Sequence, residues 1–212
     1  MESRNNTPKP HIKNKGFTLI EMAIVLIIIG IIIGAVVKGK DIVRSAEQKR
    51  LYSKFLNSWE VAYNAYYDRT GWILGDTDTP DNSGARDGRC SGASCANLVA
   101  QLKAVGLEPP TQGPSGSECA RQYTDSTGTQ HMLNINFRND SDDQASNYNY
   151  IRISIIPNEL GVAWDRMIDG ESSGDRGSFV YIPDSTTPVR TSWPSAQVQP
   201  GANSESRLLL TF

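Results

Sequence analysis

Glu21 is the residue of this chain whose position most requires a chemical explanation. It lies in the segment Phe17–Val37, where Thr18 and Glu21 are the only strongly polar residues. A carboxylate inside an apolar membrane span is costly, so such residues are usually paired or functional. The sequence therefore predicts a partner or a role for Glu21.

The three cysteines, Cys90, Cys95 and Cys119, follow the apolar segment. On an oxidising side of a membrane, an odd number of cysteines predicts one disulfide and one remaining thiol. A Cys90–Cys95 bridge would close a tight loop. A Cys95–Cys119 or a Cys90–Cys119 bridge would join a short helix to the following segment, and spacing does not choose between the three.

Two acidic clusters are candidates for a calcium site, with solvated loop charge as the alternative for both. In the first cluster, Asp76, Asp78 and Asp87 occupy positions one, three and twelve of a calcium loop. Pro80 stands where a ligand is expected, and Asp81 stands where the turn needs glycine. The second cluster is Asp169, Glu171 and Asp175.

Other site chemistries find little support in the residue types present. The 212 residues include only two histidines, which argues against a Cys/His zinc site or a histidine-rich catalytic set. No nucleotide-binding loop, metalloprotease helix or nucleophile elbow is found. The net charge of −2 argues against broad binding of nucleic acid. We therefore expect no catalytic residues and no cofactor, and calcium at one of the two acidic clusters is the alternative.

The segment Phe17–Val37 that carries Glu21 has the length and composition of a membrane anchor. As a helix its 21 residues span about 32 Å, enough to cross a hydrocarbon core of about 30 Å. Residues 1–16 before it have a net charge of +3, which favours a cytoplasmic location. A cleaved secretory signal is disfavoured by the length of the run. A lipoprotein signal requires a cysteine near the end of the apolar run, and this chain has none there. A plain signal anchor would leave Glu21 unexplained.

The residues 15–21, KGFTLIE, resemble the type IV prepilin family, which includes pilins, the pseudopilins of type II secretion and related filament subunits. The shared features are a basic leader that ends in glycine, a following Phe, a Glu four residues later, and an unbroken apolar helix. This resemblance covers about the first 37 residues.

The resemblance implies that a prepilin peptidase cuts the Gly16–Phe17 bond on the cytoplasmic side and methylates the new amino group of Phe17. Glu21 would then offset this ammonium, in its own chain or in a neighbouring subunit. The other implied partners are further pilin or pseudopilin subunits, an inner-membrane assembly platform, and membrane lipid before assembly. The precursor would lie in the bacterial inner membrane, and the mature chain in a periplasmic pseudopilus or an extracellular filament.

Gly30 and Gly34 form a G-x-x-x-G pair within the anchor. They would allow close packing of neighbouring helices in a filament core. The alternatives are that glycine is simply common in membrane helices, or that the pair loosens the helix during assembly.

The anchor is expected to continue into one helix of about 50 residues, because residues 41–67 contain no Gly or Pro. Apolar and aromatic side chains recur at spacings of three and four, which predicts an amphipathic face. These residues are Leu51, Tyr52, Phe55, Leu56, Trp59, Ala62, Tyr63 and Tyr66. Gly71 should end the helix.

Short helices and strands are expected in the remainder. Ser94 should cap a helix over residues 95–105, and Asn158–Ile168 should form another. Alternating apolar residues predict strands over 132–137, 150–156 and 177–182, with a closing strand over 208–212 and a loop over 183–206.

These elements predict an α+β, pilin-like fold, in which the long N-terminal helix, with its first half transmembrane, packs on a small antiparallel sheet. The expected divisions are a leader (1–16), a transmembrane or filament-core helix (17–37), its amphipathic continuation (38–70) and a globular domain (71–212). The resemblance predicts a structural subunit and no enzyme. The alternative is an adhesin or binding module on the same anchor, with its site in the loops 72–94 or 183–206.

Overall fold

The structure is a computed structural model that describes residues 16–76, 86–90, 93–113, 116–144, 147–195, 200–201 and 204–211. The chain divides into two compact units, with the boundary between Ser45 and Ala46. The second unit, Ala46–Phe212, therefore includes most of the segment predicted as an amphipathic continuation of the anchor.

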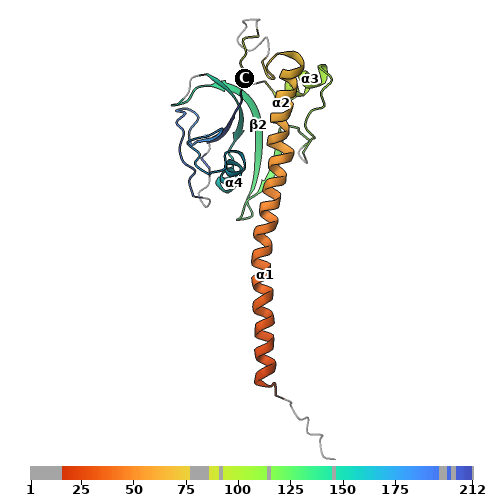
Figure 1. Cartoon of the computed structure of the whole chain (residues 1–212), viewed down its shortest axis with the longest axis vertical. Helices are drawn as coiled ribbons and strands as arrows, with labels where there is room; N and C mark the ends of the chain where they lie inside the picture. Colours follow the sequence, from red (N-terminus) through yellow and green to blue (C-terminus); the bar gives the residue numbers. More distant parts are fainter. Residues whose placement is uncertain are drawn as a thin grey trace, which may run out of the picture. The chain divides into compact units, whose positions relative to one another are not determined.

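A continuous helix of 52 residues runs from Leu19 to Thr70, which confirms the predicted single long helix. It consists of α1 (Leu19–Leu51), a π-helical turn η1 (Tyr52–Leu56) and α2 (Asn57–Thr70) (Figure 1). Gly71 ends it in the left-handed conformation, with φ of 71°, and donates its N–H to the carbonyl of Tyr67 at 2.7 Å. Glycine takes this conformation without the steric cost that other residues have.

The predicted amphipathic face of the helix forms much of the core of the second unit. Leu51 and Tyr52 are half-buried at its beginning. The other six side chains of the predicted face are buried: Phe55, Leu56, Trp59, Ala62, Tyr63 and Tyr66. The spacing in the sequence therefore identified the packed face correctly.

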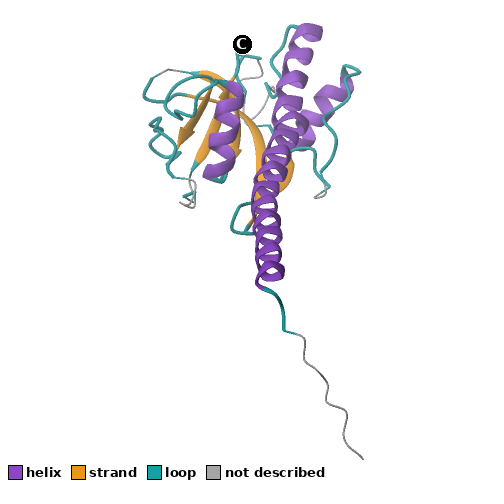
Figure 2. Cartoon of the chain, turned by 60° about the horizontal axis from the view of Figure 1, so that its bottom comes forward, coloured by secondary structure: helices purple, strands orange, loops and turns teal. Residues whose placement is uncertain are grey.

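The described residues of the second unit form a five-stranded antiparallel sheet with the order β1-β2-β3-β5-β4 (Figure 2). The strands are β1 (Ala120–Thr124), β2 (Gln130–Asp140), β3 (Tyr148–Ser154), β4 (Phe179–Ile182) and β5 (Glu205–Leu209). Two further helices are α3 (Cys95–Ala104) and α4 (Asn158–Ile168). Ser94 caps α3 as predicted, since its hydroxyl accepts the N–H of Asn97 at 3.3 Å.

One face of this sheet packs against both α2 and α4. Phe137 of β2 meets Trp59 and Tyr63 of α2, at ring-centroid distances of 5.8 and 5.7 Å. Phe179 lies on the same face of β4 and meets Trp164 of α4 at 6.4 Å. This packing agrees with the predicted α+β arrangement of a long helix on a small sheet.

The strands differ from the sequence-based expectations at several ends, and three of the differences are informative. Strand β1 was not predicted, because its sequence, ARQYT, lacks a clear apolar alternation. Strand β3 ends at Ser154 rather than at residue 156, because Ile155 takes a φ of 53°, which interrupts extended pairing. Strand β5 begins at Glu205, within the stretch predicted as loop.

Charge pairing explains why polar residues of β5 can be buried in the sheet. The Nε of Arg207 donates to Glu205 Oε1 at 2.6 Å, and Arg152 pairs with the other carboxylate oxygen of Glu205. The guanidinium of Arg207 also lies 4.4 Å from the centre of the Tyr150 ring. Because the buried charges compensate one another, a hydrophobic pattern is not needed there.

Candidate processing and assembly site

The start of α1 is organised by reciprocal hydrogen bonds between Thr18 and Glu21. The backbone N–H and the hydroxyl of Thr18 both donate to Glu21 Oε2 at 2.8 Å, and the N–H of Glu21 donates to Thr18 Oγ1 at 3.3 Å. This arrangement is a capping box, which satisfies two backbone N–H groups that the first turn of a helix leaves unpaired.

The capping box shows how Glu21 is accommodated at the end of an apolar helix. Its negative charge lies in the first turn, where the helix dipole stabilises an anion. Thr18 was not among the predicted site residues. The signal was present as Thr18-Leu19-Ile20-Glu21, the T-x-x-E spacing that precedes an apolar run in such caps.

Gly16 and Phe17 precede α1 in non-helical conformation. The Phe17 residue is 81% exposed, and a Cβ placed on Gly16 would have nothing within 4 Å among the other atoms. The Gly16–Phe17 peptide bond is therefore sterically open, as a site of proteolysis requires. Residues 1–15 of the predicted leader lie outside the described part of the chain.

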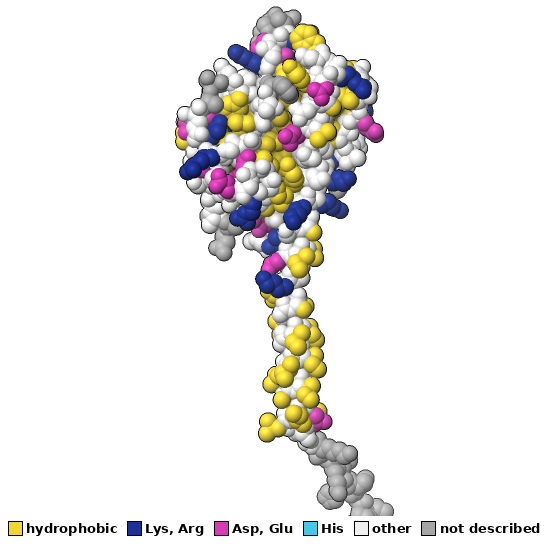
Figure 3. Space-filling view, viewed as in Figure 1, with side chains coloured by type: hydrophobic (Ala, Val, Ile, Leu, Met, Phe, Trp, Pro, Cys, Tyr) yellow, Lys and Arg dark blue, Asp and Glu magenta, His cyan; other side chains and the backbone are white. Residues whose placement is uncertain are grey.

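Along its first half α1 exposes apolar side chains, and Figure 3 shows them on the visible face of this segment. Gly30 and Gly34 both lie here, and a Cβ on either would meet nothing within 4 Å. Of the helices that the structure describes, the one beginning at Leu19 is long and apolar enough to cross a membrane. Its apolar surface could be covered by lipid or by other apolar helices.

The structure pairs Cys95 with Cys119 in a disulfide, one of the three pairings that the sequence left open. This bridge joins the first residue of α3 to the residue before β1. Cys90 is a buried free thiol that donates to the carbonyl oxygen of Leu74 at 3.4 Å. Burial raises the pKa of the Cys90 thiol, so it stays protonated at neutral pH.

Of the three acidic residues in the first candidate calcium site, the structure describes Asp76 and Asp87. Asp76 is 3% exposed, and its Oδ2 accepts the N–H of Gly88 at 2.9 Å. Asp87 is exposed and accepts the N–H of Arg89 at 3.0 Å. Asp78 lies outside the described residues.

In the second candidate calcium site, the carboxylate of Asp169 is hydrogen-bonded to the backbone at the beginning of β4. Its carboxylate accepts the N–H groups of Ser178 and Phe179, at 2.9 and 2.8 Å. Glu171 is exposed, and Asp175 lies 3.7 Å from Arg176 Nε. Within the described ranges, no three His, Cys, Asp or Glu side chains come together as a group that could hold a metal ion.

Comparison with known proteins finds a match to a family model near the beginning of the chain. Residues 12–37 match the family model described as the prokaryotic N-terminal methylation motif, the leader signature of type IV prepilins. No curated protein and no solved structure matches the chain. The chain therefore carries the signature of a type IV pilin-like or pseudopilin-like precursor.

This motif implies two kinds of partner, a prepilin peptidase that processes the chain and other pilin subunits with which it assembles. Together with the apolar helix, it fits a precursor that is anchored in the inner membrane.

Proposed function

We propose that this protein is a structural subunit of a type IV pilus-like filament or of a type II secretion pseudopilus, and that it has no enzymatic activity. The observation that carries the proposal is the combination of the methylation motif at residues 12–37 with an exposed apolar helix that precedes a compact unit. In the precursor, lipid covers this helix. In the assembled filament, the apolar helices of neighbouring subunits replace lipid.

Processing at the Gly16–Phe17 bond places a new ammonium group one residue before Thr18. Glu21 Oε2 already accepts two bonds from Thr18, and Oε1 accepts none among the described residues. Oε1 is therefore available to the ammonium group of Phe17, in the same chain or in an adjacent subunit. Pairing stabilises both charges in an apolar environment, where each alone is costly.

Assembly in this proposal involves an inner-membrane platform that extracts the helix from the bilayer. Gly30 and Gly34 lack side chains, so an adjacent helix can approach the backbone of α1 closely at these positions. The mature protein then belongs to a periplasmic pseudopilus or an extracellular filament.

The decisive experiment is to express the full chain in a bacterial membrane with a prepilin peptidase and to determine its intact mass and N-terminal sequence. We expect a chain that begins at Phe17 and carries one added methyl group. Gly16→Val should remain uncut, because its side chain hinders the scissile bond.

Gly39→Val is the matched control, since Gly39 lies in α1 with open space around it and beyond the predicted span. This variant should be processed as the wild type is. An uncut wild-type chain, or a cut after Val37, would contradict the proposed function.

A further inference from the structure

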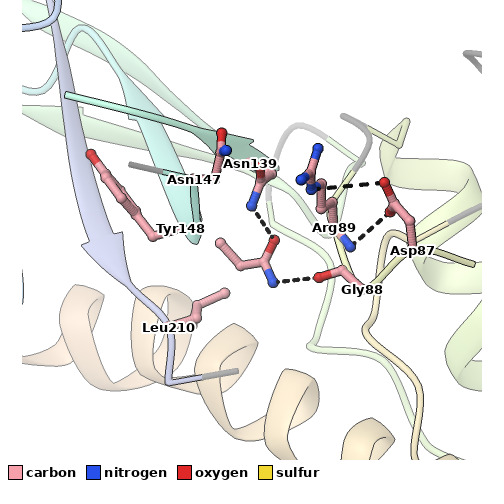
Figure 4. A pocket seen from close by; sticks show the side chains of 8 residues that line it. Asp87, Gly88, Arg89, Asn139, Asn147, Tyr148 and Leu210 are labelled. Atoms are coloured by element: carbon pink, nitrogen blue, oxygen red, sulfur yellow. Dashed lines mark hydrogen bonds and ion pairs between the residues drawn. The ribbon is translucent and has the colours of Figure 1, made fainter. Parts of the chain in front are cut away.

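A cavity of about 350 Å³ lies where β2 ends and β3 begins (Figure 4). Its walls come from residues 87–89, from Asn139 of β2, from residues 147–149 and from Leu210 after β5. All of these belong to the unit Ala46–Phe212, so the inference does not depend on the proposed role of α1. The segment 87–89 lies in the loop 72–94, one of the two loops predicted to hold the site of a binding module.

The side-chain amide of Asn149 holds the walls of this cavity together. Asn149 is 5% exposed, and its Oδ1 accepts the N–H of Cys90 at 2.9 Å and the Nδ2 of Asn139 at 3.0 Å. Its Nδ2 donates to the carbonyl oxygen of Gly88 at 2.9 Å. These bonds tie the loop to the sheet, so the cavity exists before any ligand binds. A preformed site loses less conformational entropy on binding than a mobile one.

Two asparagines leave hydrogen-bonding groups available at the cavity. The side-chain Nδ2 of Asn139 donates to Asn149 Oδ1. The side-chain Oδ1 of Asn139 accepts no bond within the described residues. Asn147 is exposed, and no hydrogen bond of its side chain occurs within those residues either. Its φ of 52° is uncommon for a residue with a side chain, although asparagine tolerates it better than most. Both side chains line the cavity and are labelled in Figure 4.

The charged groups at the cavity compensate one another. Asp87 accepts the N–H of Arg89, and its Oδ2 lies 3.8 Å from Arg89 Nε. The formal charges of these two residues cancel, and both side chains are about half exposed. An anionic ligand would have to compete with Asp87 for the guanidinium group of Arg89. The carboxylate oxygens remain good acceptors for hydroxyl groups.

We propose that this cavity binds an uncharged saccharide. Adjacent sugar hydroxyls donate and accept hydrogen bonds together, which matches the paired donor and acceptor atoms of an amide and the acceptors of a carboxylate. Leu210 adds an apolar contact for the C–H groups of a sugar ring. An apolar ligand would leave the amides unpaired at a cost. The volume lies within the range of about 300–1,000 Å³ that is typical of small-molecule sites.

The test uses the full chain in detergent micelles, titrated with glucose, galactose, mannose, N-acetylglucosamine and N-acetylgalactosamine. Saturation-transfer NMR detects binding, and the titration gives the dissociation constant. At least one neutral sugar should bind, with a Kd on the order of 1 mM, as expected for a few hydrogen bonds to one ring. Glucuronic acid and N-acetylneuraminic acid should bind at least about 10-fold more weakly, a difference of about 1.4 kcal/mol.

Asn147→Gly removes one amide and retains a residue that accepts a positive φ, so it should fold normally. This variant should weaken sugar binding by about 3- to 10-fold, the equivalent of one lost hydrogen bond. Asn134→Ala removes an exposed amide from β2 outside the cavity and should leave the Kd unchanged.

Three outcomes would overturn the proposal. The first is that no neutral sugar binds at about 50 mM, far above the expected Kd. The second is that the acidic sugars bind as tightly as the neutral ones. The third is that Asn147→Gly and Asn134→Ala have the same effect.

Discussion

Asp165 of α4 is a buried carboxyl group whose two oxygens differ in their environment. Its Oδ2 accepts the N–H of Gly174 at 2.9 Å and the indole N–H of Trp193 at 2.7 Å. Its Oδ1 is buried and has no hydrogen-bond partner in the described structure. Burial, assisted by the nearby carboxylate of Asp169, raises the pKa of Asp165 to about 6, although the hydrogen bonds from Trp193 and Gly174 act in the opposite direction. The folded protein therefore favours the protonated form of this group.

The first prediction concerns the pH dependence of stability. Between pH 4 and pH 6, Asp165 retains its proton in the folded state after the unfolded chain has lost it. Its contribution to the free energy of unfolding is therefore largest below about pH 4 and falls as the pH rises through 6, by up to about 3 kcal/mol. Asp165→Asn keeps an acceptor and cannot ionise. Urea unfolding of the full chain at pH 4 and pH 7 should show the variant gaining stability relative to the wild type by up to this amount.

Glu171→Gln is the control for this measurement, because Glu171 is exposed. The stability difference between Glu171→Gln and the wild type should be the same at both pH values. If the difference between Asp165→Asn and the wild type were also independent of pH, Asp165 would have an unperturbed pKa and our interpretation would be wrong.

At the scale of elements, α4 and the segment before β5 are joined by Trp193, which packs against a glycine of the helix. A Cβ on Gly161 would lie 2.2 Å from Cζ3 of Trp193, which is closer than real atoms approach. The same indole stacks on Tyr181 and Phe179, at centroid distances of 4.8 and 5.9 Å. Glycine is a poor helix former, and the structure shows that the missing side chain of Gly161 provides space for Trp193.

The second prediction is that Gly161→Ala lowers the free energy of unfolding. Overpacking should cost about 1–3 kcal/mol, and the better helix propensity of alanine should offset about 1 kcal/mol of this, so the net loss should be up to about 2 kcal/mol. Thermal and urea unfolding measure the net change. In a Trp193→Ala background the same substitution should be neutral or stabilising, because the clash is gone. An equal cost in both backgrounds would show that Trp193 is not the obstacle.

At the scale of the whole molecule, the boundary of the compact unit at Ala46 lies well before the predicted globular domain at 71–212. The side chains of Phe55, Trp59 and Tyr63 are completely buried and belong to the core of this unit. Residues 46–70 are therefore part of the folded body.

The third prediction follows from this boundary. A chain that starts at Ala46 should be soluble without detergent and should unfold cooperatively, because it lacks the exposed apolar half of α1 and keeps its core. A chain that starts at Gly71 should aggregate or remain unfolded, since the sheet would lose the aromatic side chains that cover it. Circular dichroism and size-exclusion chromatography distinguish these outcomes. Cooperative folding of the shorter chain would place the domain boundary at residue 71 instead.

Several elements could be predicted from the sequence because their causes are local. The long helix, its end at Gly71, the cap at Ser94 and the helix α4 depend on residues within a few positions of one another. The motif over residues 12–37 was recognised for the same reason, and the roles of Gly16, Phe17 and Glu21 within it stay predictions. Thr18 carried a local signal too, although its role in the capping box was missed.

The elements and contacts that were not predicted depend on residues that are distant in the sequence. Strand β5 begins at Glu205 because its charge is paired with Arg152, 53 residues earlier. The bridge between Cys95 and Cys119 required the position of α3 relative to β1. Spacing along the chain contains no such information.

The sequence by itself determined that the chain carries a prepilin-type leader signature, an apolar helix long enough to span a membrane, and a polar body with an amphipathic helix. These properties follow from composition and short-range periodicity. Only the tertiary structure decided which cysteines pair, where the folded body begins, and that Asn139, Asn149 and Gly88 meet at one cavity. The reason is physical, because such contacts depend on long-range packing and on hydrogen bonds that form only when distant segments come together.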